Sequence, residues 1–99
     1  MIPAHRSMPG AKRALAEFIY ENLPSLLKQH QGRMRKDNAR MAIEKAFREQ
    51  HGWRKELDEL EEPGRPMSSN AWGWALHWLA AEGITKKCSG SQFYELASR

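Results

Sequence analysis

A chain of 99 residues has room for one domain, because a second hydrophobic core would have too little polypeptide to bury itself. Its hydrophobic fraction of 40% and charged fraction of 28% are ordinary for a globular domain, and its net charge of +4 is too small to identify a partner by itself. No apolar run approaches the ~20 residues of a membrane span, and the start of the chain lacks the apolar core of a secretory signal. The single cysteine, Cys88, excludes an internal disulfide, so we expect a cytoplasmic protein.

Residues 1–10 contain two prolines and no periodicity, which predicts a flexible N-terminal segment before a domain that spans 11–99. Pro24 lies within the apolar pattern that follows, and proline cannot donate a backbone hydrogen bond inside a helix. We therefore predict two helices here, one over about 12–22 and one over 24–31. Their apolar side repeats at spacings of three and four and consists of Leu15, Phe18, Ile19, Leu23, Leu26 and Leu27.

The middle of the chain predicts a third helix, with an N-cap at Asp37 or Asn38 and a C-terminal glycine at Gly52. Its apolar stripe consists of Ala39, Ala42, Ile43, Ala46 and Phe47. A short helix or turn is expected next, with its apolar side on the core, and 61–66 has the composition of a loop. The apolar residues of that short element are Trp53, Leu57 and Leu60.

The last third of the chain predicts a helix followed by two short strands. Ser68, Ser69 and Asn70 can each cap a helix that runs to Glu82 and ends at Gly83. This helix buries Trp72, Leu76 and Leu79 along one side. Residues 84–88 and 92–96 are short and contain threonine and aromatic residues on either side of a Ser-Gly-Ser turn, which predicts a β-hairpin.

Three or four short helices followed directly by a hairpin form the arrangement of the winged helix-turn-helix. In that arrangement the hairpin is the wing and the helix before it is the recognition helix. Three short helices bury little surface and a two-stranded hairpin is only marginally stable alone, so packing one on the other closes the core. We therefore predict a mainly α fold with a C-terminal β-hairpin, a single winged helix-turn-helix domain.

The segment SNAWGWALHWLAAEGI, residues 69–84, resembles the N-terminal winged-helix domain of Mrr-type restriction endonucleases. That family has a helix with an Asn, a Gly-Trp-Ala-Leu run and a later Leu and Gly, then a basic wing that ends in an aromatic-x-Leu strand. The corresponding residues here are Asn70, Gly73-Trp74-Ala75-Leu76, Leu79, Gly83 and Tyr94-Glu95-Leu96, and Leu23-Pro24-Ser25-Leu26-Leu27 resembles the start of the domain. Ala71, Ala80 and Ala81 stand where the family usually has Arg or Lys. The resemblance implies a DNA-binding domain, and we expect no nuclease domain within these 99 residues because no chain remains for it.

The side of the 68–82 helix opposite its apolar stripe carries candidate DNA contacts. Asn70 has the amide that can pair with adenine, Gly73 permits close approach of a backbone, and His77 can donate to a phosphate or a base. Ser69, at the start of the helix, completes this set. The alternative interpretation is that Asn70 only caps the helix and that His77 is a solvent-exposed spacer.

Basic residues outside this helix predict contacts to phosphates, which supply affinity without sequence information. Lys86 and Lys87 lie on the first wing strand, although two lysines can also protect a strand edge from aggregation. Arg35, Lys36 and Arg40 lie at the start of the third predicted helix, where positive charge is unfavourable unless an anion binds. The simpler interpretation is a solvated helix face. Arg65, in the loop before the last helix, is a further candidate.

The sequence favours no enzymatic activity, metal or cofactor. Its histidines and Cys88 are widely separated and lack the short ligand pairs of a zinc site. Five acids and no base occur in 56–62, which is typical of a solvated linker. No glycine-rich phosphate loop is present.

We therefore predict a non-enzymatic module that binds double-stranded DNA, either as a stand-alone transcription regulator or as part of a restriction-type protein. The alternative is a winged helix that mediates protein–protein contact, in a homodimer or a larger complex. Two observations motivate it. One is the alanines of the recognition helix that stand where the family has basic residues, and the other is the pair Trp74 and Trp78, spaced i and i+4, which could form an exposed aromatic ridge. Otherwise the two rings pack on the core.

Overall fold

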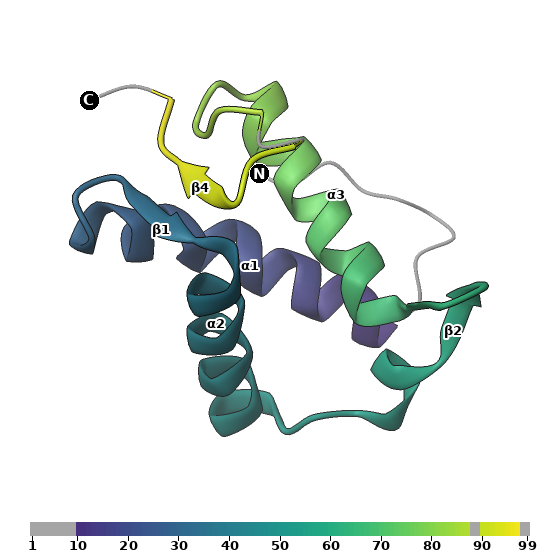
Figure 1. Ribbon diagram of the computed structural model, residues 1–99. Helices are drawn as coiled ribbons and strands as arrows, with labels where there is room; N and C mark the ends of the chain where they lie inside the picture. The colour runs from purple at the N-terminus through teal and green to yellow at the C-terminus, as the bar shows by residue number, and fades with distance from the viewer. Residues whose placement is uncertain (1–9, 88–89, 98–99) are drawn as a thin grey trace.

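The computed structural model describes residues 10–87 and 90–97, which fold into a mainly helical domain with short antiparallel sheets (Figure 1). Its elements are α1 (Gly10–Gln29), β1 (Arg33–Arg35), α2 (Lys36–His51), the 3₁₀ turn η1 (Lys55–Asp58), β2 (Leu60–Glu62), β3 (Arg65–Pro66), α3 (Met67–Ala81) and β4 (Phe93–Glu95). The predicted flexible segment lies outside the described residues except for Gly10, as do Cys88 and Ser89 of the predicted hairpin. Among the described helices, none combines the length and the apolar character needed to cross a membrane.

α1 is a single helix where the sequence analysis predicts two, and Pro24 lies inside it. Leu23 and Leu27, which flank the proline, are both fully buried. The two halves therefore pack on the same core, and this burial offsets the backbone hydrogen bond that Pro24 cannot make. The side-chain amide of Asn22 also donates to the carbonyl of Phe18 at 2.8 Å, one turn before the proline.

The C-terminal hairpin is shorter than predicted and has an additional partner strand. Thr85 forms a single bridge to Leu96, and the backbone N–H of Lys86 donates to the carbonyl of Glu95 at 3.0 Å. The other edge of β4 pairs with β1, a strand that the sequence analysis does not predict. In this antiparallel register, Arg33 lies opposite Glu95, Met34 opposite Tyr94 and Arg35 opposite Phe93.

The segment predicted as a loop before α3 contains a small ribbon, in which β2 pairs with β3. Its turn includes Gly64 with a φ of 73°, a left-handed conformation that glycine adopts without strain. The N–H of Met67 donates to the carbonyl of Glu59 at 2.9 Å, which brings the two ends of the segment together. The turn is thus predicted correctly from the sequence, whereas the pairing of the residues on either side of it is not predicted.

Two of the helix starts differ from the prediction because strands run directly into them. α2 begins at Lys36 with Arg35 at its N-cap, rather than at Asp37 or Asn38, and the N–H of Lys36 donates to the carbonyl of Gln92 at 2.9 Å. α3 begins at Met67 after Pro66, ahead of the predicted serine and asparagine caps. The predicted helix ends agree better with the structure, since Gly52 and Gly83 both have positive φ at these ends.

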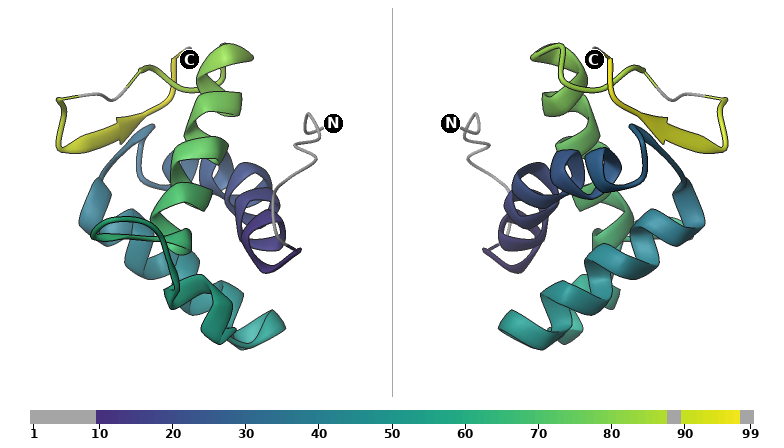
Figure 2. Two further views of the ribbon diagram at one scale, coloured as in Figure 1. Left: turned by 90° about the vertical axis from the view of Figure 1, so that its right-hand side faces the viewer. Right: turned by 90° about the vertical axis from the view of Figure 1, so that its left-hand side faces the viewer.

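The core forms where α1 crosses α3, with α2 and β4 closing one side (Figure 2). Trp72 is 1% exposed, as predicted, and its ring stacks on that of Tyr94 with centroids 5.8 Å apart and planes inclined by 8°. Its indole N–H donates to Oε2 of Glu44 at 2.8 Å. Leu57 of η1 is fully buried as predicted, whereas Leu60 is 63% exposed, because it lies on the projecting ribbon.

Replacing Trp72 by Phe should lower the free energy of unfolding by about 1–3 kcal/mol, because it removes both the indole hydrogen bond and part of the stacked surface. Chemical denaturation measures this change. Glu44→Gln is the matched control, because the amide oxygen of Gln can still accept the indole N–H. A loss from Glu44→Gln as large as that from Trp72→Phe would contradict this account of the hydrogen bond.

Candidate nucleic-acid interface

α3 has one buried and one open side, and the open side carries the predicted DNA contacts. The helix buries Ala71, Trp72, Ala75, Trp78 and Leu79. On the other side, Gly73 and His77 are exposed and Asn70 is half-buried. These three line a shallow surface hollow of about 330 Å³ together with Arg65 and Trp74. The fold thus brings Arg65, which the sequence analysis proposes separately, to the three candidates that share one side of the helix.

The floor of this hollow is low because Gly73 has no side chain. A Cβ atom placed there would meet nothing within 4 Å, so nothing in the protein itself requires a glycine for space. Asn70 is the fourth residue of α3, and Pro66 occupies the N-cap. The alternative interpretation of Asn70 as the helix cap is therefore wrong. Ser69 lies beside it, inside the helix and half-buried.

The two tryptophans that follow have different surroundings. Trp78 is 4% exposed and its ring meets that of Tyr20 edge to face at 6.5 Å, so it belongs to the core. Trp74 is half-buried, and its ring meets the imidazole of His77 edge to face at 6.0 Å. The aromatic ridge proposed for protein contact is therefore absent. Trp74 is instead a lining residue of the hollow that the sequence analysis did not assign, although its i+4 spacing from Asn70 indicates it.

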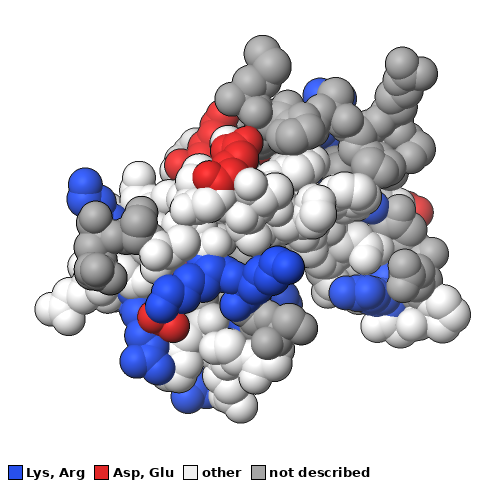
Figure 3. Space-filling model, turned by 90° about the horizontal axis from the view of Figure 1, so that it is seen from above, with Lys and Arg blue, Asp and Glu red and all other residues white. Residues whose placement is uncertain are grey.

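The outer face of the sheet gathers basic side chains from segments far apart in sequence. Arg33 lies over the ring of Phe93, 3.9 Å from its centroid, and the ammonium of Lys86 lies 3.7 Å from the carboxylate of Glu95. Arg35 is exposed and lies 3.8 Å from Asp37. Viewed from above, Lys and Arg side chains form a band toward β1 and α2, with an acidic side chain among them (Figure 3). Lys87, which follows Lys86 in the chain, is also exposed.

Arg40 and Lys36 lie beside aromatic rings rather than on the open surface. Nε of Arg40 donates to the hydroxyl of Tyr94 at 2.9 Å, and its guanidinium lies 5.4 Å from the centroid of Trp72. The ammonium of Lys36 lies 5.6 Å from the ring of Tyr94. Both side chains are half-buried, so they hold β4 against the helices, and a phosphate could approach only their outer atoms.

The C-terminal end of α3 is fastened to α1 by a hydrogen bond from the hydroxyl of Tyr20 to Oε1 of Glu82. This bond raises the pKa of Tyr20 above its ordinary value of 10.0, with smaller contributions from desolvation and from the negative charge of Glu82. The bond lies where the chain leaves α3 for the hairpin.

Among the described residues, no group of three or more His, Cys, Asp or Glu side chains is placed to hold a metal ion. Comparisons of the chain with protein-family models, with curated proteins and with solved structures give no match. The interpretation of this surface therefore rests on its own geometry and charge.

The Tyr20–Glu82 bond predicts a loss of stability at alkaline pH. Because the folded protein holds the phenolic proton more tightly than the unfolded chain, the stabilisation is fully present below about pH 10 and is lost as the pH rises through the raised pKa. Tyr20→Phe cannot form the bond at any pH. Chemical denaturation should therefore show a difference in unfolding free energy between wild type and Tyr20→Phe that is constant near neutral pH and shrinks above about pH 10. A difference that grows with pH would contradict this role.

Proposed function

We propose that the chain is a winged helix-turn-helix module that binds double-stranded DNA and catalyses no reaction. The order α1, β1, α2, α3 and then a hairpin whose strand β4 pairs with β1 supports this proposal. In this proposal α3 is the recognition helix and the segment from Thr85 to β4 is the wing. The single observation that carries the proposal is the hollow on α3, which gathers an amide, an imidazole and a guanidinium on an open helix face.

The chemistry of the hollow matches the edges of base pairs in a major groove. An asparagine amide both donates and accepts, which is what adenine presents at N7 and N6. Arg65 can pair bidentately with guanine or with a phosphate. The absence of a side chain at Gly73 lets the helix approach closely at the middle of this surface, while the ring of Trp74 gives it an apolar side that suits the methyl group of thymine.

The surroundings of α3 suit the flanking DNA backbone. The hairpin leaves the C-terminal end of α3, the β2–β3 ribbon lies near its N-terminal end, and both project to the same side of the helix (Figure 2). A duplex on that side would meet Lys87 at one end and Arg65 at the other. The cations on the outer face of the sheet would add attraction over a longer range. Such a module would act in the cytoplasm, as a stand-alone regulator or as the target-reading part of a restriction-type protein.

Titration of fluorescent duplex DNA, followed by anisotropy at low and moderate salt, tests this proposal. We expect binding that weakens as salt rises, because each phosphate contact releases counterions. Lys87→Ala should weaken binding to all sequences alike and reduce the salt slope by about 1. Arg13→Ala is the charge-matched control, because the first turns of α1 lie on the side away from the hairpin (Figure 2). No salt-dependent binding at tens of micromolar protein would exclude the proposal.

Recognition of the DNA sequence by Asn70 is tested separately, with a randomised duplex library. Asn70→Ala should reduce discrimination at one base position by about 1–3 kcal/mol while leaving much of the total affinity, because it removes a base contact and no phosphate contact. Gln50→Ala, which removes an exposed amide at the far end of α2, should leave the preference unchanged. An unchanged preference in Asn70→Ala would show that this amide does not read DNA.

A further inference from the structure

The sheet formed by β1 and β4 has an inner face on the core and an outer face toward solvent. Side chains alternate between the two faces along each strand. Tyr94 is 1% exposed and Met34, directly opposite it, is half-buried, so this pair faces the core. Their neighbours Arg33, Arg35 and Phe93 therefore lie on the outer face. The proposed binding of a duplex to α3 gives this outer face no direct contact.

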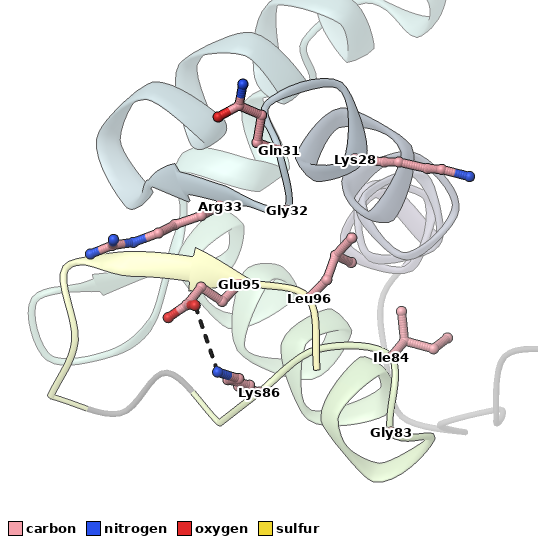
Figure 4. A pocket seen from close by; sticks show the side chains of 9 residues that line it. All are labelled: Lys28, Gln31, Gly32, Arg33, Gly83, Ile84, Lys86, Glu95 and Leu96. Carbon is pink, nitrogen blue, oxygen red and sulfur yellow. Dashed lines mark ion pairs between the residues drawn. The ribbon is translucent and has the colours of Figure 1, made fainter. Parts of the chain in front are cut away.

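Two of these side chains form a stack. The guanidinium of Arg33 lies over the ring of Phe93, 3.9 Å from its centroid, which is contact distance for two planar groups. Figure 4 shows the Arg33 side chain reaching outward along β4, away from the surface hollow of about 620 Å³ beside the sheet. Phe93 is half-buried and Arg33 is exposed, so the ring supports a guanidinium that stays accessible. We call this pair the Arg33–Phe93 stack.

Two further cations lie on either side of the stack. Arg35 is directly opposite the aromatic ring in the register of the two strands, and the Lys86–Glu95 ion pair lies on the other side of β4 from Arg33 (Figure 4). The side chain of Arg35 is 52% exposed and lies 3.8 Å from Asp37, and that of Lys86 is 58% exposed. Ion pairs as exposed as these are weak and are screened by salt. A phosphate can therefore replace either carboxylate.

The chemistry of this face suits the flat side of a nucleobase. Unpaired bases stack on aromatic rings and on the planes of arginine side chains, while cations along the same surface hold the backbone. In a duplex the bases are stacked on each other and present only their edges in the grooves. A flat face that carries a supported guanidinium therefore favours an unpaired strand over a duplex. The hollow on α3 has the opposite character, because its amide and guanidinium suit base edges.

We propose that the outer face of the β1–β4 sheet binds single-stranded nucleic acid, with one base stacked on the guanidinium of Arg33. The phosphates on either side of that base then contact Arg35 and Lys86. Phe93 is a positioning residue, because it acts by holding the guanidinium in place. The site shares no residue with the hollow on α3 and does not depend on duplex binding.

Fluorescence anisotropy at low salt, with labelled oligothymidylate or oligouridylate of about ten nucleotides, tests the proposal. The two probes distinguish DNA from RNA as the source of the strand. Each strand that binds should do so more weakly as salt rises, because its phosphates release counterions. A probe of the same length and backbone that lacks its bases should bind at least about fivefold more weakly, because it cannot stack.

Arg33→Lys separates stacking from charge, because it keeps the positive charge and removes the planar group. It should weaken binding of the single strand at least about fivefold and leave both the salt slope and duplex binding unchanged. Arg48→Lys is the matched control. Arg48 lies in the last turn of α2, where its guanidinium is 5.0 Å from the ring centroid of Trp53, so the variant alters the same kind of contact elsewhere. It should bind as wild type.

The positioning role of Phe93 is tested by the preference for strands that carry bases. Phe93→Leu removes the ring beneath the guanidinium and should reduce the ratio of the affinities for the normal and the base-free probe. Phe93→Tyr keeps the ring and should retain this ratio. A general loss of folding would weaken binding of both probes alike and leave the ratio unchanged.

Three outcomes would overturn the proposal. No binding of either strand at tens of micromolar protein and low salt would show that the face holds no nucleic acid. Equal affinity of the wild-type protein for the normal and the base-free probe would indicate attraction to any polyanion, without stacking. Binding of the single strand by Arg33→Lys as tightly as by wild type would show that the guanidinium does not carry the base. Circular dichroism of every variant confirms that its helices are intact.

Discussion

The stack of Trp72 on Tyr94 is the contact on which the arrangement of this domain depends. It joins the middle of α3 to β4, and both rings are almost completely buried. Glu44 accepts the indole N–H, while Arg40 donates to the tyrosine hydroxyl and covers the indole ring. A β-hairpin of so few residue pairs has little stability of its own. Its position relative to α3 is therefore determined by this aromatic contact and by its pairing with β1.

This constraint explains why α3 can have an open face. The apolar side chains of the helix are concentrated on the side that meets α1 and Tyr94, and edge-to-face contact with Tyr20 draws Trp78 into the same core. The opposite side presents Asn70, Gly73 and His77 beside the half-buried ring of Trp74. The packing of one side thus leaves the other side open to the surface. Trp74 and Trp78 also differ in exposure. A helical spacing of four residues is slightly more than one full turn, so the two rings do not point in the same direction.

Charge is distributed along the length of α3 in a similar way. Cations from α1, β1 and the hairpin meet near its C-terminal end, while the acids of 56–62 precede its N-terminal end. Separation of the two groups keeps the cationic surface from being neutralised within the molecule. It leaves the domain with a cationic end and an acidic end. The small net charge of +4 conceals this polarity, because it sums the two ends.

The sequence alone determined the features that depend on neighbours along the chain. Apolar spacing identified the buried sides of the helices, glycines marked the ends of α2 and α3, and the open side of α3 with Asn70, Gly73 and His77 followed from the same periodicity. Tertiary structure decided what depends on distant partners. The segment Arg33-Met34-Arg35 carries no strand signal in the sequence, and it becomes β1 only because β4 offers its free edge. Pro24 stays inside a helix because both flanking turns are buried in one core, and Arg40 turns inward because an aromatic stack lies beside it. Such pairings are worth little locally and become favourable only when the whole chain has folded around them.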